Sequence, residues 1–153
     1  MKLIKLNVIF FVLMLSACAN SNMTANNKQV RQGVTGQVLW LEGNLMPGPG
    51  RNTTQGEPVV REIYFYNPVK MKDLKGSGNL YEEVPGEAVA VATSDTEGNF
   101  SVKLKPGQYS VFTKEPQGYF ASSFNGEGVV NPVKVQENEI TEMNIKINYK
   151  AVY

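Results

Sequence analysis

Residues 94–109 read Ser-Asp-Thr-Glu-Gly-Asn-Phe-Ser-Val-Lys-Leu-Lys-Pro-Gly-Gln-Tyr, and this stretch decides the fold. From position 100 to 104 the residues alternate between apolar and polar, which predicts a strand with one buried and one solvated face. Asp95 and Gly98 stand just before it and are typical of a tight turn, because glycine adopts positive φ without steric cost. We therefore expect a turn followed by a strand whose first side chain, Phe100, enters the core.

A second turn ends this strand. Pro106 and Gly107 predict that the chain reverses direction there, because both residue types favour turns. Tyr109 then begins the next strand, and its ring is expected to face inward.

The rest of the chain is built in the same way. Short runs rich in β-branched and aromatic residues are separated by Gly, Pro and Asn, as expected of strands and turns. The predicted strands cover residues 34–41, 59–66, 88–93, 100–104, 108–113, 129–135 and 140–149. No segment shows a sustained helical period. The sequence therefore predicts an all-β protein, a single antiparallel β-sandwich of about seven strands.

The last predicted strand, residues 140–149, has the clearest periodicity in the chain. Its apolar face is predicted to hold Met143, Ile145, Ile147 and Tyr149. The intervening residues are polar or charged, and charges at alternate positions protect a sheet edge from pairing with other molecules.

Two connections are longer than a sandwich needs to join neighbouring strands. They are residues 42–58 and 67–87, which we predict to be loop insertions. Loops beyond about 12–15 residues are usually functional or disordered, so both are candidate binding elements. A third irregular stretch, residues 115–128, carries Tyr119 and two phenylalanines.

The middle of the chain resembles the carboxypeptidase regulatory-like domain, a transthyretin-like (prealbumin-like) sandwich. The resemblance rests on a Ser-Asp-x-x-Gly-x-Phe turn, a Pro-Gly-x-Tyr turn and a Gly-Tyr pair. The matching positions are Asp95, Gly98, Phe100, Pro106, Gly107, Tyr109, Gly118 and Tyr119. In that family the peptidase is a separate domain, so the resemblance implies a structural or binding module without catalysis.

Residues 1–17 have the features of a bacterial lipoprotein signal peptide. Lys2 and Lys5 precede an apolar run. The following Leu-Ser-Ala-Cys ending resembles a lipobox, which implies that Cys18 becomes the lipid-bearing N-terminus. Two alternatives remain open: a plain signal peptide with a small-x-small cleavage site, and a retained anchor. The apolar run is shorter than the about 20 residues that a membrane span requires.

The predicted organisation then has three parts. Residues 1–17 form the signal peptide, and residues 18–32 form the lipidated cysteine and a flexible tether rich in Asn, Ser and Thr. Residues 33–153 form the carboxypeptidase regulatory-like β-sandwich. We expect the protein to be exported and lipid-anchored, in a bacterial outer membrane.

The composition excludes several classes of function. The chain has 15 Lys and Arg and 14 Asp and Glu, and removal of Lys2 and Lys5 with the signal leaves 13 basic side chains. This balance gives nucleic-acid binding no electrostatic support. The absence of histidine and the single cysteine exclude His/Cys zinc sites, histidine-dependent catalysis and disulfides within the chain. We expect no metal and no cofactor.

Acidic residues suggest chemistry at two places. Asp95, with Glu97 and Asn99 at alternate positions, offers about half of the oxygen ligands that calcium needs, and a hairpin turn explains the same residues. Residues 82, 83 and 87 are glutamates that a hydrolase would use, but adjacent loop positions do not define a facing carboxylate pair.

Aromatic residues are the candidates for binding, because exposed rings form platforms for sugars or peptides. The candidates are Trp40, Tyr64, Tyr66 and Tyr81. In the strand at 59–66, both faces are apolar or aromatic. One face belongs to the core, and the tyrosine face is either covered by residues 67–87 or open to a partner.

The sequence therefore predicts a non-catalytic cell-envelope lipoprotein that presents a binding module to an envelope protein or a glycan. The first alternative is a purely structural envelope component or accessory subunit that associates through strand edges. A carboxylate-dependent hydrolase is the distant alternative.

Overall fold

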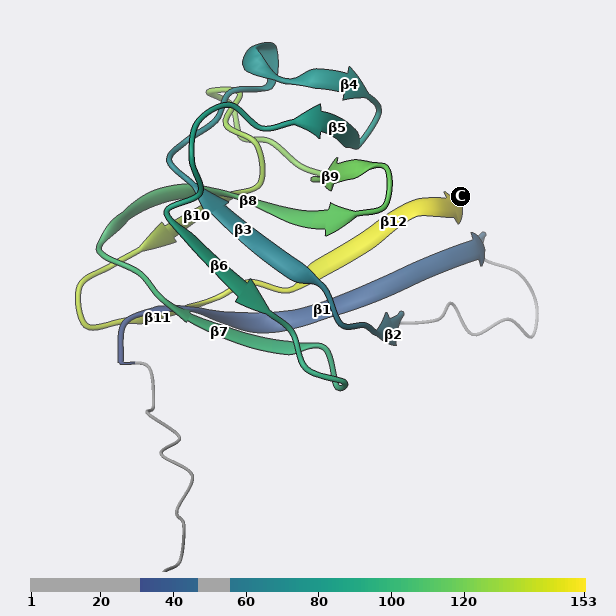
Figure 1. Ribbon diagram of the computed structural model, residues 1–153. Coiled ribbons are helices and arrows are strands. Elements are labelled where there is room, and N and C mark those ends of the chain that lie inside the picture. The colour runs from purple at the N-terminus through teal and green to yellow at the C-terminus, as the bar shows by residue number, and fades with distance from the viewer. Residues whose placement is uncertain (1–30, 47–55) are drawn as a thin grey trace, which may run out of the picture.

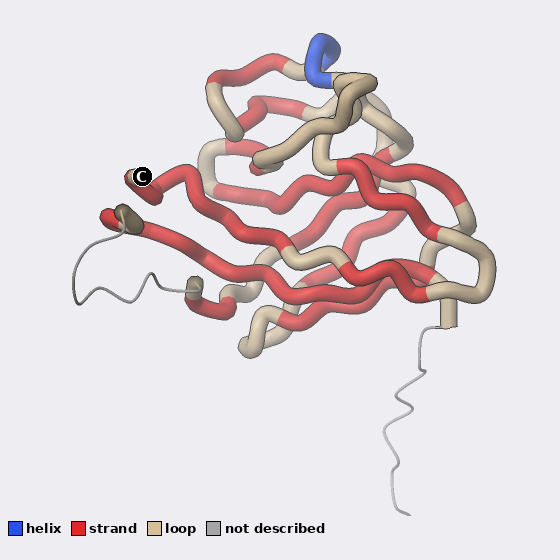
Figure 2. The backbone as a smooth tube through the Cα atoms, turned by 180° about the vertical axis from the view of Figure 1, so that it is seen from behind, coloured by secondary structure: helices blue, strands red, loops and turns tan. Residues whose placement is uncertain are grey.

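The computed structural model of this chain describes residues 31–46 and 56–153 (Figure 1). The described chain is all-β, and its strands form two sheets packed face to face as a sandwich. The only helical element in this part is a single 3-10 turn, η1 (Met71–Asp73), drawn in blue in Figure 2. The predicted all-β class and its sandwich arrangement are therefore confirmed.

The first sheet is built around a long central strand, β1 (Gly33–Asn44). On one side β1 pairs antiparallel with β2 (Glu57–Pro58) and β7 (Asn99–Lys103). On the other side it pairs parallel with β11 (Ile140–Glu142) and β12 (Ile145–Val152). This sheet is mixed rather than purely antiparallel, because parallel neighbours need a crossover and the whole second sheet lies between β1 and β11 in the chain.

The second sheet is antiparallel throughout. Its strands follow the order β4-β5-β9-β8-β3-β6, and β10 pairs with the first half of β8. Their bounds are β3 (Glu62–Tyr66), β4 (Lys75–Ser77), β5 (Leu80–Glu83), β6 (Ala90–Thr93), β8 (Gly107–Glu115), β9 (Gly118–Phe120) and β10 (Pro132–Val135). Figure 1 shows this row from β4 at the top to β6 at the front.

Each of the seven predicted ranges contains a strand, and the structure adds short ones. The range 140–149 is divided into β11 and β12, with Met143 and Asn144 between them. The Met143 amide donates to the Thr35 carbonyl (2.8 Å), and the Asn144 side chain accepts from the Gln37 amide (2.9 Å). The side chain of Asn144 thus supplies an acceptor where the ladder is interrupted.

The predicted loop at 67–87 is not a structureless insertion. It contains η1 and a hairpin, β4–β5, which extends the second sheet by pairing with β9. Gly78 and Asn79 form the turn of this hairpin, and Gly78 has a φ of 64°. In the range 42–58, β1 continues to Asn44 and β2 occupies 57–58, while 47–55 lie outside the described residues.

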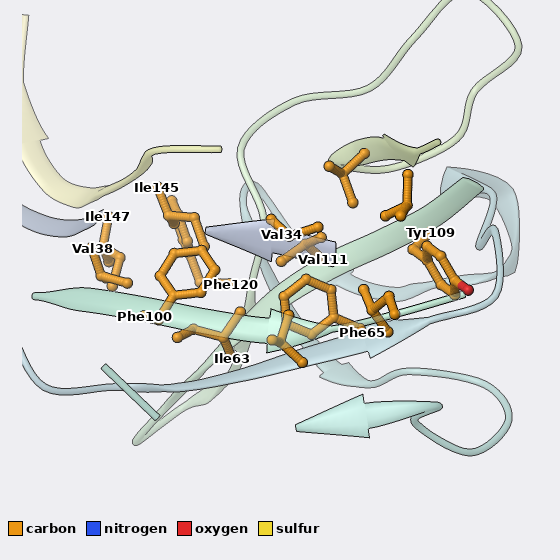
Figure 3. Close-up of a cluster of buried hydrophobic side chains, with 14 residues drawn as sticks. Val34, Val38, Ile63, Phe65, Phe100, Tyr109, Val111, Phe120, Ile145 and Ile147 are labelled. Carbon is orange, nitrogen blue, oxygen red and sulfur yellow. The ribbon is translucent and has the colours of Figure 1, made fainter. Parts of the chain in front are cut away.

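The main core lies between the two sheets (Figure 3). Val34, Val38, Ile145 and Ile147 of the first sheet pack against side chains of the second, among them Ile63, Phe65, Val111 and Phe120. Phe100 and Tyr109 are both buried there, as predicted from residues 94–109. Met143 and Tyr149 are half-buried beside this cluster, so the predicted apolar face of the last strand is confirmed.

Candidate functional site

The outer face of the second sheet carries a group of tyrosines. Strand β3 directs Ile63 and Phe65 into the main core, so Tyr64 and Tyr66 point to the opposite face. Tyr119 of β9 reaches the same face. We call Tyr64, Tyr66 and Tyr119, with the flanking side chains of Glu62 and Lys114, the tyrosine face.

The rings of the tyrosine face contact one another closely. Tyr64 and Tyr119 meet edge to face with centroids 5.5 Å apart, and Tyr66 meets Tyr119 in the same way at 6.5 Å. Tyr64 and Tyr66 lie stacked at 6.5 Å. Such pairs add about 0.5–1.5 kcal/mol each beyond area burial, so the rings hold one another in place.

Part of this outer face is covered by the chain itself. Tyr66, Tyr81 and Phe112 are buried in a second apolar cluster. The covering side chains are Val69, Val84, Ala121 and Val130. The expectation that residues 67–87 cover the tyrosines is therefore correct for Tyr66, and Tyr81 belongs to the cover. Tyr64 and Tyr119 remain partly exposed at its border.

Two opposite charges flank the exposed rings. The Tyr64 hydroxyl donates to the Glu62 carboxylate at 3.1 Å, and this hydrogen bond, followed by burial, raises the pKa of Tyr64. The Lys114 ammonium lies 3.9 Å from the centroid of the Tyr119 ring. Burial, and then a hydrogen bond with Tyr119, raises the pKa of Tyr66 to about 12. The face therefore places tyrosine rings between the Glu62 carboxylate and the Lys114 ammonium.

Trp40 does not belong to this face. It lies on β1 and packs edge to face against Tyr149, with centroids 5.2 Å apart. The Arg61 guanidinium lies 5.7 Å and the Lys150 ammonium 5.6 Å from the Trp40 ring, and the indole N–H donates to Glu42 at 3.0 Å. The four aromatic residues suggested by the sequence are thus divided between two regions, and Trp40 packs against the main core.

A buried ion pair near Trp40 was not visible in the sequence. The side chain of Glu115 is fully buried, and its carboxylate accepts from the Arg61 Nε at 3.0 Å and from the Tyr149 hydroxyl at 3.1 Å. Glu115 lies in step with Tyr109, Val111 and Thr113 on β8, but Ser110 and Phe112 are buried too, so alternation along this strand gives no signal for the pair. The pair ties the second sheet to the first through Tyr149.

The two turns of residues 94–109 have the geometry that their sequence predicts. The Asp95 Oδ1 accepts from the amides of Glu97 (2.9 Å) and Asn99 (2.8 Å), which is an Asx turn rather than a metal loop. Gly98 has a φ of 77°, and a Cβ there would lie 2.5 Å from the Val38 carbonyl oxygen. Beyond Pro106 and Gly107, the Tyr109 hydroxyl donates to the Lys105 carbonyl at 2.9 Å.

Other sequence candidates lie apart from the tyrosine face or outside the described residues. Glu82, Glu83 and Glu87 are exposed, and Glu83 forms a surface ion pair with Lys75 at 3.5 Å. Residues 1–30, which include the predicted signal peptide and Cys18, are outside the described part. Within the described part, no helix has the length and apolar character to cross a membrane.

Comparison with known proteins gives no relative for this chain: no protein-family model, no curated protein and no solved structure matches it.

Proposed function

We propose that this protein is a non-catalytic cell-envelope lipoprotein whose β-sandwich presents an interaction surface to an envelope protein or a glycan. One observation carries the binding part of the proposal. Tyr64 and Tyr119 stay partly exposed between Glu62 and Lys114, on a sheet face whose other aromatic rings are covered by the chain itself.

The covered part of the outer sheet face contrasts with the part that stays exposed. Next to Tyr64, the same sheet face buries Phe112 and Tyr66 beneath valines from two connections. The connections stop short of Tyr64 and Tyr119, and leave rings that are apolar in body and polar at the tip. Tyrosines of this kind are enriched at interfaces, where one end packs and the other hydrogen-bonds.

The subcellular location is proposed from the sequence. The lysines, apolar run and lipobox-like ending of residues 1–18 support export and lipidation at Cys18. The resemblance of residues 94–109 to the carboxypeptidase regulatory-like domain supports a module without catalysis. A module of this kind acts by contact, so the exposed tyrosines are where we place the contact.

The binding part can be tested by photo-crosslinking in intact cells. A photoreactive benzoylphenylalanine replaces Tyr64 in the full chain, and a control chain carries it at Lys146, an exposed residue of β12 in the other sheet. We expect adducts from position 64 that are absent from position 146, and digestion with a protease or with glycan-cleaving enzymes identifies their class. Equal adducts at both positions, or none at 64, would contradict the proposed surface.

The proposed membrane location is tested separately by replacing Cys18. The Cys18→Ser chain is expected in the soluble fraction and without incorporated palmitate, since stable anchoring requires the acyl chains. Membrane association that persists in this variant would refute lipidation at Cys18.

A further inference from the structure

We propose that the free edge of β6, beside the tyrosine face, binds an extended segment of a partner protein as an added β-strand. The segment would carry apolar residues at alternate positions and basic residues at both ends. This inference rests on the proposed function as an interaction module, and names the class of partner and how it binds.

Strand β6 ends its sheet with an unpaired edge. Among the described strands, β3 is the only one that pairs with it, and Figure 1 shows β6 as the last of the row. Just after β6, the Ser94 amide donates to the Arg61 carbonyl at 3.0 Å. Bonded residues alternate along an antiparallel strand, so the amide and carbonyl groups of Val91 and Thr93 face away from β3. The described residues give these groups no backbone partner, and β7, which follows β6 through the turn at 94–98, contacts β6 without pairing with it.

The edge of β6 lacks the usual protection against such pairing. The edge strand of the other sheet, β12, carries exposed Lys146 and Lys150, and β4 carries Lys75 and a glycine. Strand β6 reads Ala-Val-Ala-Thr, with no charge and no proline. Proteins normally protect a free edge with charges, prolines or bulges, so an edge without them is a template for an added strand.

The side chains along β6 lead from this edge to the tyrosine face. Ala90 and Ala92 pack against the main core, whereas Val91 is 50% exposed on the outer face. Val91 is the cross-strand partner of Tyr64. Alternate side chains of an added strand would therefore lie on the same outer face as Val91 and Tyr64, and one of them would lie directly beside Val91. Apolar residues at these positions would bury the exposed valine.

The charges around the edge favour a basic segment. Glu87 precedes β6, Asp95 and Glu97 follow it, and Glu62 lies beside it on β3, all of them exposed. No Lys or Arg occurs from 87 to 97. A second copy of this chain paired antiparallel about Val91 would place Glu87 opposite Asp95, and like charges directly opposite are destabilising. Charge complementarity therefore selects a different chain with Lys or Arg at its ends.

The probe is a nine-residue peptide, Lys-Thr-Val-Thr-Val-Thr-Val-Thr-Lys, added to the full-length lipidated chain in detergent micelles. Hydrogen exchange followed by NMR should show new protection of the Val91 and Thr93 amides. A peptide with Glu at both ends should bind about tenfold more weakly, because each of the two exposed charges contributes a factor of about three. N-methylation of one peptide amide that faces β6 should cost about fivefold, the value of one hydrogen bond.

Two variants and a matched control locate the site. Val91→Lys places a charge on the free edge, and should weaken peptide binding at least about tenfold, as charged residues do on natural edges. Val152→Lys alters another exposed valine, on β12 of the other sheet, and should leave binding unchanged. Glu87→Lys should weaken binding of the Lys-ended peptide by about threefold and strengthen binding of the Glu-ended peptide.

Three results would overturn the inference. One is unprotected Val91 and Thr93 amides at saturating peptide. Another is self-association of the chain that Val91→Lys abolishes, which would make a second copy the occupant. The third is a glycan oligosaccharide that perturbs Tyr64 and Tyr119 while the peptide does not bind. That last result would leave the proposed interaction surface standing, whereas a failure of crosslinking from position 64 would remove the surface itself.

Discussion

Removing Arg61 from its buried partner should destabilise the protein more than any other single charge change in the described chain. Arg61→Met keeps an apolar side chain of similar reach, but it removes the guanidinium that lies over Trp40 and leaves Glu115 without its cation. The Glu115 side chain is fully buried, and among the described residues the Tyr149 hydroxyl would be its one remaining side-chain donor. Breaking a fully buried pair costs about 3–5 kcal/mol, and because Arg61 is 26% exposed we expect about 3 kcal/mol at pH 7.

The paired replacement separates the cost of a lone charge from the value of the pair. Arg61→Met with Glu115→Leu removes both charges and fills the site with apolar atoms, which is often neutral for buried pairs. We expect the double variant to recover most of the stability lost by Arg61→Met.

The assay is urea unfolding of the full chain at pH 7, followed by tyrosine and tryptophan fluorescence. The free energy of unfolding is obtained by linear extrapolation. A loss below about 1 kcal/mol in Arg61→Met, the value of an exposed pair, would refute the reasoning. A double variant as unstable as the single one would refute it too, since the penalty would then not come from an unpaired carboxylate.

Three further predictions concern positions set by the backbone or by burial. Gly118→Ala should lower the melting temperature sharply, because φ is 142° and the new Cβ would lie 2.2 Å from the Tyr81 carbonyl oxygen. The control is Gly126→Ala, which has open space around it and should change the melting temperature little. Asp95→Ala should cost about 1–2 kcal/mol in urea unfolding, because two turn amides lose their acceptor, and Asp95→Asn should restore most of it. Tyr66 should ionise near pH 12 in an ultraviolet titration. Its contribution to stability is complete below about pH 10 and should be lost as the pH rises toward 12. A normal titration of Tyr66 would contradict its burial.

The strands could be predicted wherever one face is buried and the other is wet. Residues 100–104 and 145–149 have this alternation, and the structure places their apolar residues in the core. The β4–β5 hairpin was predicted as a loop because its strands are short, rich in glycine and charge, and bury a single large side chain, Tyr81. Half-buried strands alternate in the same way in parallel and antiparallel pairs, so the parallel pairing of β1 with β12 left no local signal.

The candidate site could be predicted only in part. The period of β3 placed Tyr64 and Tyr66 on one face, which the structure confirms. It gave no reason to separate Trp40 from them, because Trp40 depends on β12 for its neighbour Tyr149. The Arg61–Glu115 pair joins residues 54 positions apart, and such a pairing follows from the strand order rather than from any local pattern.

The position of β1 has a consequence for how this protein acquires its structure. The first strand of the sandwich receives partners from β7 and from the last strand, and the Gln37 amide bonds to a side chain 107 positions further along. One edge of β1 therefore stays open until β12 has been synthesised, and the first sheet is incomplete before then. Chains dominated by such distant pairings fold slowly. A growing chain of this protein should therefore lack the closed sandwich until β12 has been synthesised and has paired with β1.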